Sequence, residues 1–162
     1  MGKNVKTLEK KFALILNTKY AVSCNSGTDA LILSLRACNI GPGDEVITSP
    51  FTYFATAEAI ALVGAKPIFA DINPHTFNIN YKQVESLITK KTKAIMPVHI
   101  FGQAAEMIPL KKLCRNYNLK LIEDCAQSFG AKIDKIHTGT LGDFGCFSFF
   151  PTKNLGCAGD GG

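Results

Sequence analysis

Lys153 is the residue of this chain whose surroundings best suit covalent chemistry. It follows a short apolar run, Phe147–Phe150, and precedes the glycine-rich stretch Gly156–Gly162. Ser148 places a hydroxyl five residues upstream. An amine on a fixed backbone, with a phosphate ligand nearby and little steric crowding, is what a Schiff-base lysine requires. Because most lysines are solvated surface charges, this interpretation depends on the other motifs of the chain.

Ser26, Gly27 and Thr28 form a candidate phosphate site. They lie in the segment Asn25–Ala30, which follows an expected strand and begins an expected helix. Backbone N–H groups at the start of a helix, together with two hydroxyls, bind phosphate. The same residues could equally be an ordinary N-cap, in which Ser26 or Thr28 caps the helix and Asp29 favours its dipole.

Acidic residues stand at the end of a buried strand in the segment Lys120–Gln127. Ligands of α/β folds bind outside the carboxyl ends of the parallel strands. A carboxylate is costly to bury there unless it is paired, and a protonated pyridine nitrogen would be a good partner for Asp124. The alternative is a turn acid that accepts hydrogen bonds from neighbouring backbone N–H groups.

An aromatic segment, Ser49–Ala57, occupies a similar position after another expected strand. One of its aromatic rings could stack on a planar cofactor, whereas core packing is the commoner role of any single aromatic side chain. Ser148 could donate to the same phosphate as the first site, or it could be a plain strand hydroxyl. Together, the segments offer phosphate ligands, a ring stacker, an acid for a ring nitrogen and a reactive amine.

The elements that must position these residues alternate between helix and strand. Apolar spacing predicts helices at Val5–Leu16, Thr28–Cys38, Phe54–Val63, Tyr81–Ile88 and Ala105–Tyr117. Short apolar runs predict strands at Tyr20–Cys24, Glu45–Thr48, Pro67–Ala70, Ala94–Val98, Leu119–Ile122, Lys132–Lys135 and Asp143–Phe150. This alternation favours an α/β fold in three layers, with helices on both faces of a mostly parallel sheet.

The composition is that of a globular protein with one core, and it argues against several classes of function. The 162 residues are 46% hydrophobic and 19% charged. The net charge of +5 comes from scattered basic residues, so no nucleic-acid partner is expected. No apolar stretch is long enough to cross a membrane, and no membrane association is expected. The six cysteines lack zinc-site spacing, which favours free thiols in the cytoplasm and no metal.

This set of motifs resembles the DegT/DnrJ/EryC1/StrS family of nucleotide-sugar aminotransferases. That family has the aspartate-aminotransferase-like fold of pyridoxal 5'-phosphate (PLP) enzymes. The resemblance extends from about Val5 to Gly162, and its most specific parts are Asn25–Leu31, Glu123–Ser128 and Ser148–Gly162. The segment Val98–Gln103 also matches the family, without an assigned chemistry.

The resemblance implies a role for each candidate residue. Lys153 would hold PLP covalently and move the proton during the reaction, and Asp124 would pair with the pyridine nitrogen. Gln127 would lie near the ring hydroxyl, and Tyr53 would stack on the ring. The residues expected at the PLP phosphate are Ser26, Gly27, Thr28 and Ser148.

The implied reaction transfers an amino group, with glutamate as the expected donor, to a keto group of a nucleotide-linked sugar. Family members are longer, so residues 1–162 are expected to be a partial large domain without the C-terminal small domain. The full-length protein is expected to form a homodimer.

Three alternatives stay open. A PLP-dependent sugar dehydratase of the same family would carry a histidine in place of Lys153. A truncated chain could be a non-catalytic fragment. A nucleotide-binding oxidoreductase would need a glycine fingerprint after the first strand, which this sequence lacks.

Overall fold

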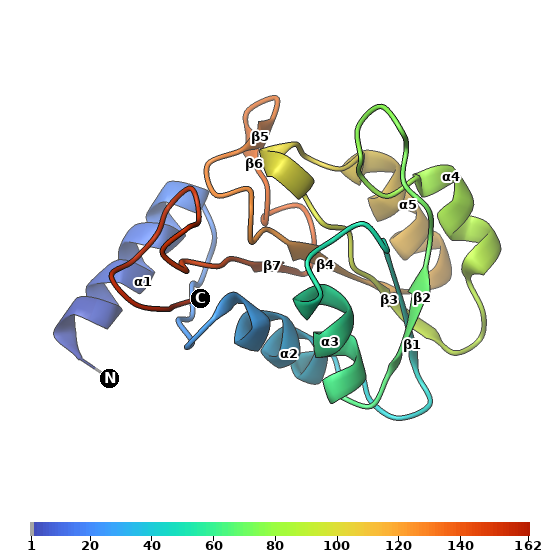
Figure 1. Ribbon diagram of the computed structural model, residues 1–162, viewed down its shortest axis with the longest axis horizontal. Coiled ribbons are helices and arrows are strands. Elements are labelled where there is room, and N and C mark those ends of the chain that lie inside the picture. The colour runs from blue at the N-terminus through green and yellow to red at the C-terminus, as the bar shows by residue number, and fades with distance from the viewer. Residues whose placement is uncertain (1) are drawn as a thin grey trace.

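The computed structural model describes residues 2–162 and has a five-stranded parallel sheet at its centre (Figure 1). The strand order is β2-β1-β3-β4-β7. These strands are β1 (Glu45–Thr48), β2 (Lys66–Phe69), β3 (Thr92–Ile95), β4 (Lys120–Asp124) and β7 (Phe144–Cys146). The α-helices are α1 (Lys3–Leu16), α2 (Gly27–Ala37), α3 (Ala55–Leu62), α4 (Tyr81–Val84) and α5 (Met107–Tyr117). The predicted α/β class is confirmed.

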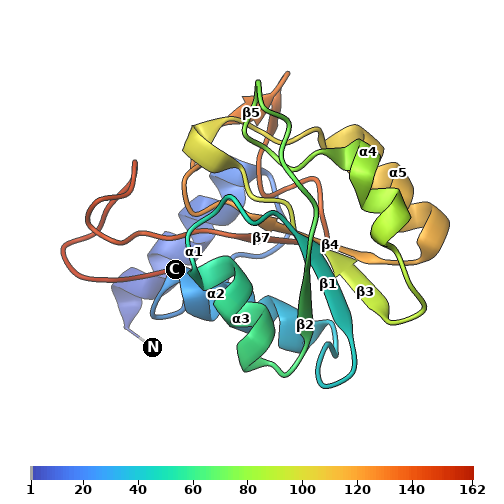
Figure 2. The ribbon, with the colours of Figure 1, turned by 45° about the vertical axis from the view of Figure 1, so that its right-hand side comes forward.

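Helices cover both faces of the sheet, as Figures 1 and 2 show. Helices α2 and α3 share one apolar cluster with Val46 and Ile122, whereas α5 shares a second cluster with Ile47 and Leu121. Neighbouring strand residues thus face opposite clusters, as the twofold periodicity of a strand requires. Burial of both faces explains the consecutive apolar residues Val46–Ile47 in β1 and Leu121–Ile122 in β4, and the helices on both faces confirm the three-layer arrangement.

Helix α1 lies beside the C-terminal segment, away from the centre of the sheet (Figure 1). The Phe12 ring stacks on Phe149 with centroids 5.0 Å apart and meets Phe129 edge-on at 5.2 Å. Leu16 is buried, whereas Leu8 is 42% exposed. The predicted apolar face of this helix is therefore only partly covered.

The predicted strand at Tyr20–Cys24 is wrong. Cys24 exchanges two backbone hydrogen bonds with Gly162, but the rest of the segment joins no ladder among the described residues. The Ser23 N–H instead donates to the Glu9 carboxylate at 2.9 Å. Strand-like composition is not enough here, because a strand also needs a neighbouring backbone to pair with.

The predicted single strand at Lys132–Lys135 is also wrong, because the chain folds back inside it. Two short antiparallel strands, β5 (Lys132–Ile133) and β6 (Ile136–His137), form a hairpin there. Asp134 occupies the turn with a φ of 53°, a conformation that aspartate tolerates better than most residues.

Strand β7 is shorter than the predicted Asp143–Phe150. Beyond Cys146 the chain leaves the sheet, and the backbone of Phe149 pairs with Gly161 and Cys157. The predicted helix over Tyr81–Ile88 is likewise shorter, because α4 gives way to a 3₁₀ turn at Glu85–Leu87.

Strand β3 ends before the predicted Val98, and β4 extends past the predicted Ile122. Pro97 has no backbone N–H, so the ladder is interrupted and resumes only at an isolated bridge between Val98 and Asp124. The extension of β4 matters for function, because it makes Asp124 the last residue of a buried strand.

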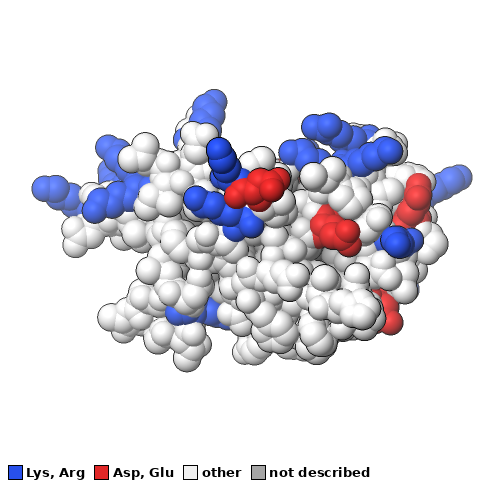
Figure 3. Space-filling model, turned by 90° about the horizontal axis from the view of Figure 1, so that it is seen from above, with Lys and Arg blue, Asp and Glu red and all other residues white. Residues whose placement is uncertain are grey.

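Surface charge is distributed in separate groups. On the face shown in Figure 3, Lys and Arg side chains form several clusters with acidic side chains between them. None of the helices within residues 2–162 combines the length and the hydropathy that crossing a membrane would require.

Candidate active site

The candidate residues come from segments that meet at one edge of the sheet. Asp124 ends β4, Ser148 follows β7, and Tyr53 lies in the connection from β1 to α3. Gly27 begins α2, which packs against β4 and β7. Because parallel strands end at the same edge, the topology itself gathers these residues where α/β folds bind ligands.

Gly27 and Ser148 are in direct contact at the start of α2. A Cβ atom on Gly27 would lie 2.6 Å from the Ser148 Cβ and 3.2 Å from its hydroxyl. Ser26 is the N-cap, because its hydroxyl accepts a hydrogen bond of 3.0 Å from the Asp29 N–H. The N–H groups of Gly27 and Thr28 open the helix and have no carbonyl partner inside it. These N–H groups and the Ser148 hydroxyl form a cradle that fits a phosphate.

Gly27→Ala is expected to weaken PLP binding by about tenfold, or about 1.4 kcal/mol. The added methyl group would push the Ser148 backbone and side chain away from the helix start. PLP titration of the protein expressed from its complete coding sequence measures the effect. Gly41→Ala is the matched control, because its added methyl group would meet only an ordinary contact at 3.6 Å. Equal affinities for Gly27→Ala and wild type would contradict the cradle.

Asp124 is a buried carboxyl whose oxygens can accept a further hydrogen bond. One oxygen accepts a hydrogen bond of 2.8 Å from the Thr56 hydroxyl, and the other accepts one of 3.1 Å from the Ala126 N–H. Burial raises the pKa of Asp124, while these hydrogen bonds and the charge of Lys153 oppose that shift. A cationic N–H partner would offset the cost of burying the charge, so the site fits a protonated ring nitrogen.

Without such a partner, Asp124 should destabilise the protein when it ionises. Its folded-state pKa is raised by burial. Stability should therefore fall as the pH rises from the unfolded pKa, about 4, through the folded value. Asp124→Asn removes this titration, so the cofactor-free variant should be the more stable protein above that range. Denaturant unfolding across the pH range measures the difference, at about 1.4 kcal/mol per pKa unit. Parallel pH profiles would contradict the effect.

Lys153 lies in the turn that follows β7, close to Gln127 and Asp124. Its amine donates a hydrogen bond of 3.2 Å to the Gln127 side-chain oxygen. Its positive charge is near enough to lower the pKa of Asp124 in part. The structure thus brings the predicted amine, the predicted acid and Gln127 into one cluster.

Tyr53 is 76% exposed and lies two residues before the start of α3. Its carbonyl accepts a hydrogen bond of 3.2 Å from the N–H of Thr56, the residue that contacts Asp124. Within residues 2–162, Tyr53 is therefore not part of the core. Its stacking role stays a prediction, as do the other individual roles in the site.

The sequence analysis assigns no role to three residues that make contacts in this region, Thr56, His99 and Glu123. Thr56 pairs with the Thr52 hydroxyl at 2.8 Å as well as with Asp124. The four-residue spacing of these threonines at a helix start was a usable signal. Glu123 was a second signal, since a carboxylate inside an apolar strand must find donors. It finds them partly in His99, whose ring nitrogen lies 2.9 Å away.

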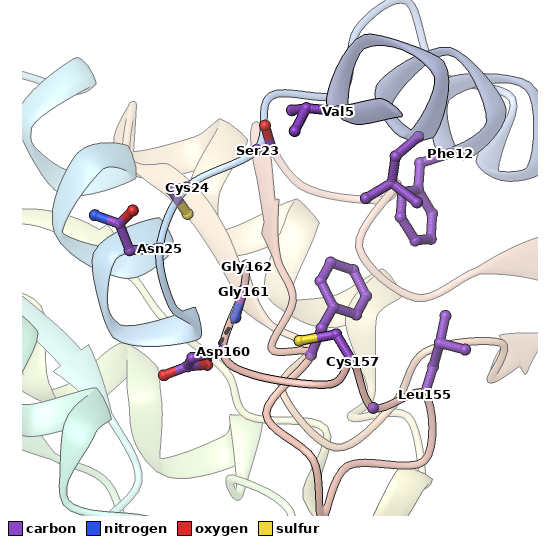
Figure 4. Close-up of a pocket in the computed structure, with 13 residues that line it drawn as sticks. Val5, Phe12, Ser23, Cys24, Asn25, Leu155, Cys157, Asp160, Gly161 and Gly162 are labelled. Atoms are coloured by element: carbon purple, nitrogen blue, oxygen red, sulfur yellow. Dashed lines mark hydrogen bonds between the residues drawn. The ribbon is translucent and has the colours of Figure 1, made fainter. Parts of the chain in front are cut away.

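A cavity of about 500 Å³ lies beside the start of α2, where Asn25, Phe149 and Gly162 line it (Figure 4). Val5 and Phe12 of α1 face the C-terminal segment that carries Leu155 and Cys157 across it. None of the predicted site residues lines this cavity. The predicted site residues thus border this cavity without lining it.

Comparison with known proteins decides the family. Residues 1–162 match the model of the DegT/DnrJ/EryC1/StrS aminotransferase family over their whole length. The chain belongs to this family. The recognition made from the motifs of Asn25–Leu31, Glu123–Ser128 and Ser148–Gly162 is thereby confirmed.

Curated relatives align with all 162 residues. A pleiotropic regulatory protein of Geobacillus stearothermophilus is 51% identical, and the chain covers 44% of its length. A UDP-N-acetyl-3-dehydro-alpha-D-glucosamine 3-aminotransferase of Acidithiobacillus ferrooxidans is 49% identical, with 44% covered. A UDP-2-acetamido-2-deoxy-3-oxo-D-glucuronate aminotransferase of Pseudomonas aeruginosa is 48% identical, with 45% covered. The chain thus spans less than half the length of these relatives.

Solved structures share the fold. A family aminotransferase from Brucella abortus superimposes with a TM-score of 0.97 at 42% identity, over 99% of this chain and 45% of that one. The NtdA protein of Bacillus subtilis, solved with bound cofactor PMP, gives 0.94 at 37% identity, over 99% and 36%. The aspartate-aminotransferase-like large-domain fold expected from the sequence is confirmed.

Proposed function

We propose that the protein is a PLP-dependent aminotransferase acting on a nucleotide-linked keto-sugar. The observation that carries this proposal is the cluster of Lys153, Asp124 and the cradle of Gly27 and Ser148 at one edge of the sheet. Amine, buried acid and phosphate donors are the groups that PLP needs. The bound cofactor of the solved relative NtdA supports the same assignment.

Each residue contributes one action to this chemistry. When bound, PLP supplies an electron sink for the transfer of the amino group. The Asp124 carboxylate would keep the ring nitrogen protonated, and Gln127 would lie near the ring hydroxyl. Tyr53 would cover one face of the ring and exclude water from it. The Lys153 amine would hold the cofactor and then carry the proton to and from the reacting substrate carbon.

The substrates follow from the relatives. Two of them are named as aminotransferases of UDP-linked keto-sugars, which supports a nucleotide-sugar acceptor. Glutamate is the proposed donor. Lys153 favours amino transfer over the dehydratase alternative, because the family resemblance implies a histidine at this position in the dehydratases.

The complete protein is proposed to be a cytoplasmic homodimer with a C-terminal small domain. The length of the relatives supports residues 1–162 as a partial large domain. Three exposed rings, Phe51, Phe77 and Phe101, touch one another with centroids 5.6–6.3 Å apart. Exposed apolar clusters mark interfaces, which supports association. All six cysteines are unpaired, which supports a reducing compartment.

Amino transfer from ¹⁵N-glutamate to a panel of nucleotide-linked keto-sugars tests the proposal. The protein expressed from its complete coding sequence, with PLP, should yield a ¹⁵N-labelled nucleotide amino-sugar by mass spectrometry. Loss of water from the sugar without gain of nitrogen would establish the dehydratase alternative instead. No product from any sugar, with no release of 2-oxoglutarate from glutamate, would leave the non-catalytic alternative.

A further inference from the structure

Glu123 binds four hydrogen-bond donors although it is completely buried. One carboxylate oxygen accepts from the N–H groups of Leu141 and Gly142, both at 2.7 Å. The other accepts from the Gly139 N–H at 2.9 Å and from the His99 ring at 2.9 Å. A buried carboxylate is tolerated when its lone pairs are filled in this way. This single side chain therefore joins β4 to the loop of residues 139–142.

His99 completes the arrangement from the other side of β4. Its Nδ1 accepts a hydrogen bond of 3.0 Å from the Ala105 N–H, so the ring proton resides on Nε2 and is donated to Glu123. Burial alone would raise the pKa of Glu123, but the hydrogen bonds from His99 and the loop hold that pKa below its ordinary value. Glu123 is thus ionised and accepts the hydrogen bond from the Nε2 proton of His99.

The backbone of His99 is tied to the acid of the site. Its N–H donates to the Asp124 carbonyl at 3.0 Å, and the Asp124 N–H donates to the Pro97 carbonyl at 2.9 Å. Since neighbouring strand residues face opposite sides, Glu123 anchors one side of β4 while Asp124 faces Thr56 on the other. A movement of Glu123 would therefore carry Asp124 with it.

A metal ion is a poor explanation of this cluster, although Cys125 brings a thiol close to His99 and Glu123. Both ring nitrogens of His99 and both oxygens of Glu123 are already engaged in hydrogen bonds. Burial also raises the pKa of the Cys125 thiol well above its usual value, which keeps the sulfur protonated. The cluster instead acts as a clamp, in which Glu123 holds the loop of residues 139–142 against β4.

The loop that Glu123 holds leads directly to the rest of the site. It enters β7, where Cys146 pairs with Asp124, and the same chain continues to Ser148 and Lys153. The loop also fits tightly against β4, because a Cβ on Gly142 would lie 2.5 Å from the Leu121 carbonyl. The positions of the acid and the amine relative to each other thus depend on how this loop sits on β4.

We propose that Glu123 and His99 are positioning residues, which clamp the loop of residues 139–142 to β4 and so set the placement of Asp124 relative to Ser148 and Lys153. This inference rests on the proposed PLP chemistry. Neither residue touches the cofactor; each acts through the backbone that carries the groups which do.

Glu123→Gln tests the clamp in the protein expressed from its complete coding sequence. A glutamine offers one acceptor oxygen to four donors, so its amide must face N–H groups. We expect hydrogen exchange at Gly139, Leu141 and Gly142 to quicken at least about tenfold. PLP affinity should fall about tenfold, as it does when outer-shell partners are lost at metal sites, and the absorption maximum of bound PLP should shift. The exposed Glu106→Gln is the matched control and should change none of these.

A second pair of variants decides the outcome if Glu123→Gln does not fold. His99→Gln keeps a donor for Glu123 and an acceptor for Ala105, whereas His99→Leu keeps neither. The glutamine variant should retain the absorption maximum of bound PLP and the PLP affinity of wild type. In the leucine variant, the PLP affinity should fall and the absorption maximum should shift. Wild-type PLP affinity and absorption in every folded variant would overturn the inference alone. Absence of PLP binding by wild type would overturn the proposed function, and the inference with it.

Discussion

Lys153→Ala is expected to reduce the rate of amino transfer by about 10⁴-fold or more. This is at the upper end of general acid–base effects, because the same amine is proposed to hold the cofactor and to move the proton. Among the described residues of this cluster, Lys153 is the amine that lies beside Gln127 and Asp124, so no other amine there can take over either task. Release of 2-oxoglutarate from glutamate in a single turnover measures the loss.

Two control variants separate the chemistry of Lys153 from its charge. Lys153→Arg keeps the positive charge near Asp124 but cannot hold the cofactor covalently, so it should be as inactive as the alanine variant. Lys112→Ala removes an exposed lysine of α5 and should react as wild type does. Activity of Lys153→Arg near that of wild type would show that charge alone matters here.

Asp124→Asn is expected to lower kcat by about 10²–10³-fold, the size of effect seen when one preorganised electrostatic group is removed. An amide can still bond to the Thr56 hydroxyl and the Ala126 N–H, so the local structure should persist. It cannot neutralise a protonated ring nitrogen. Steady-state kinetics with saturating PLP measure the loss.

The same Asp124→Asn substitution should have opposite effects on activity and stability. Without cofactor, the variant is expected to be more stable than wild type at neutral pH, because burial raises the pKa of Asp124. An active-site group that costs stability but supplies chemistry behaves in this way. The exposed hairpin variant Asp134→Asn should change neither property. An Asp124→Asn variant that is fully active would contradict the role of the carboxylate.

Sequence patterns predicted the parts of the fold that depend on local order and on burial of both faces. The strands near Val46, Ile95 and Leu121 are apolar runs because helices cover both of their sides. The failures at Tyr20–Cys24 and Lys132–Lys135 depend instead on which distant backbone is near enough to pair. Composition carries no information on that pairing.

In the site, too, features set by local sequence are predictable, whereas contacts between distant segments are not. Lys153, Asp124 and Gly27 lie in short motifs whose order along the chain is readable, and the parallel topology then brings them to one edge. The contacts of Glu123 with His99 and with the loop of residues 139–142 join segments far apart in sequence. From the sequence, one can infer that the buried Glu123 carboxylate needs hydrogen-bond donors, but not which residues supply them.

Borohydride reduction of the PLP-loaded protein, followed by peptide mapping, identifies the amine that holds the cofactor. Borohydride fixes the cofactor permanently to the amine that holds it, and mass spectrometry then finds that amine. We expect a single modified lysine, Lys153, in the peptide between Phe147 and Gly162. A cofactor found on another lysine, or on none while Lys153 stays unmodified, would contradict this expectation.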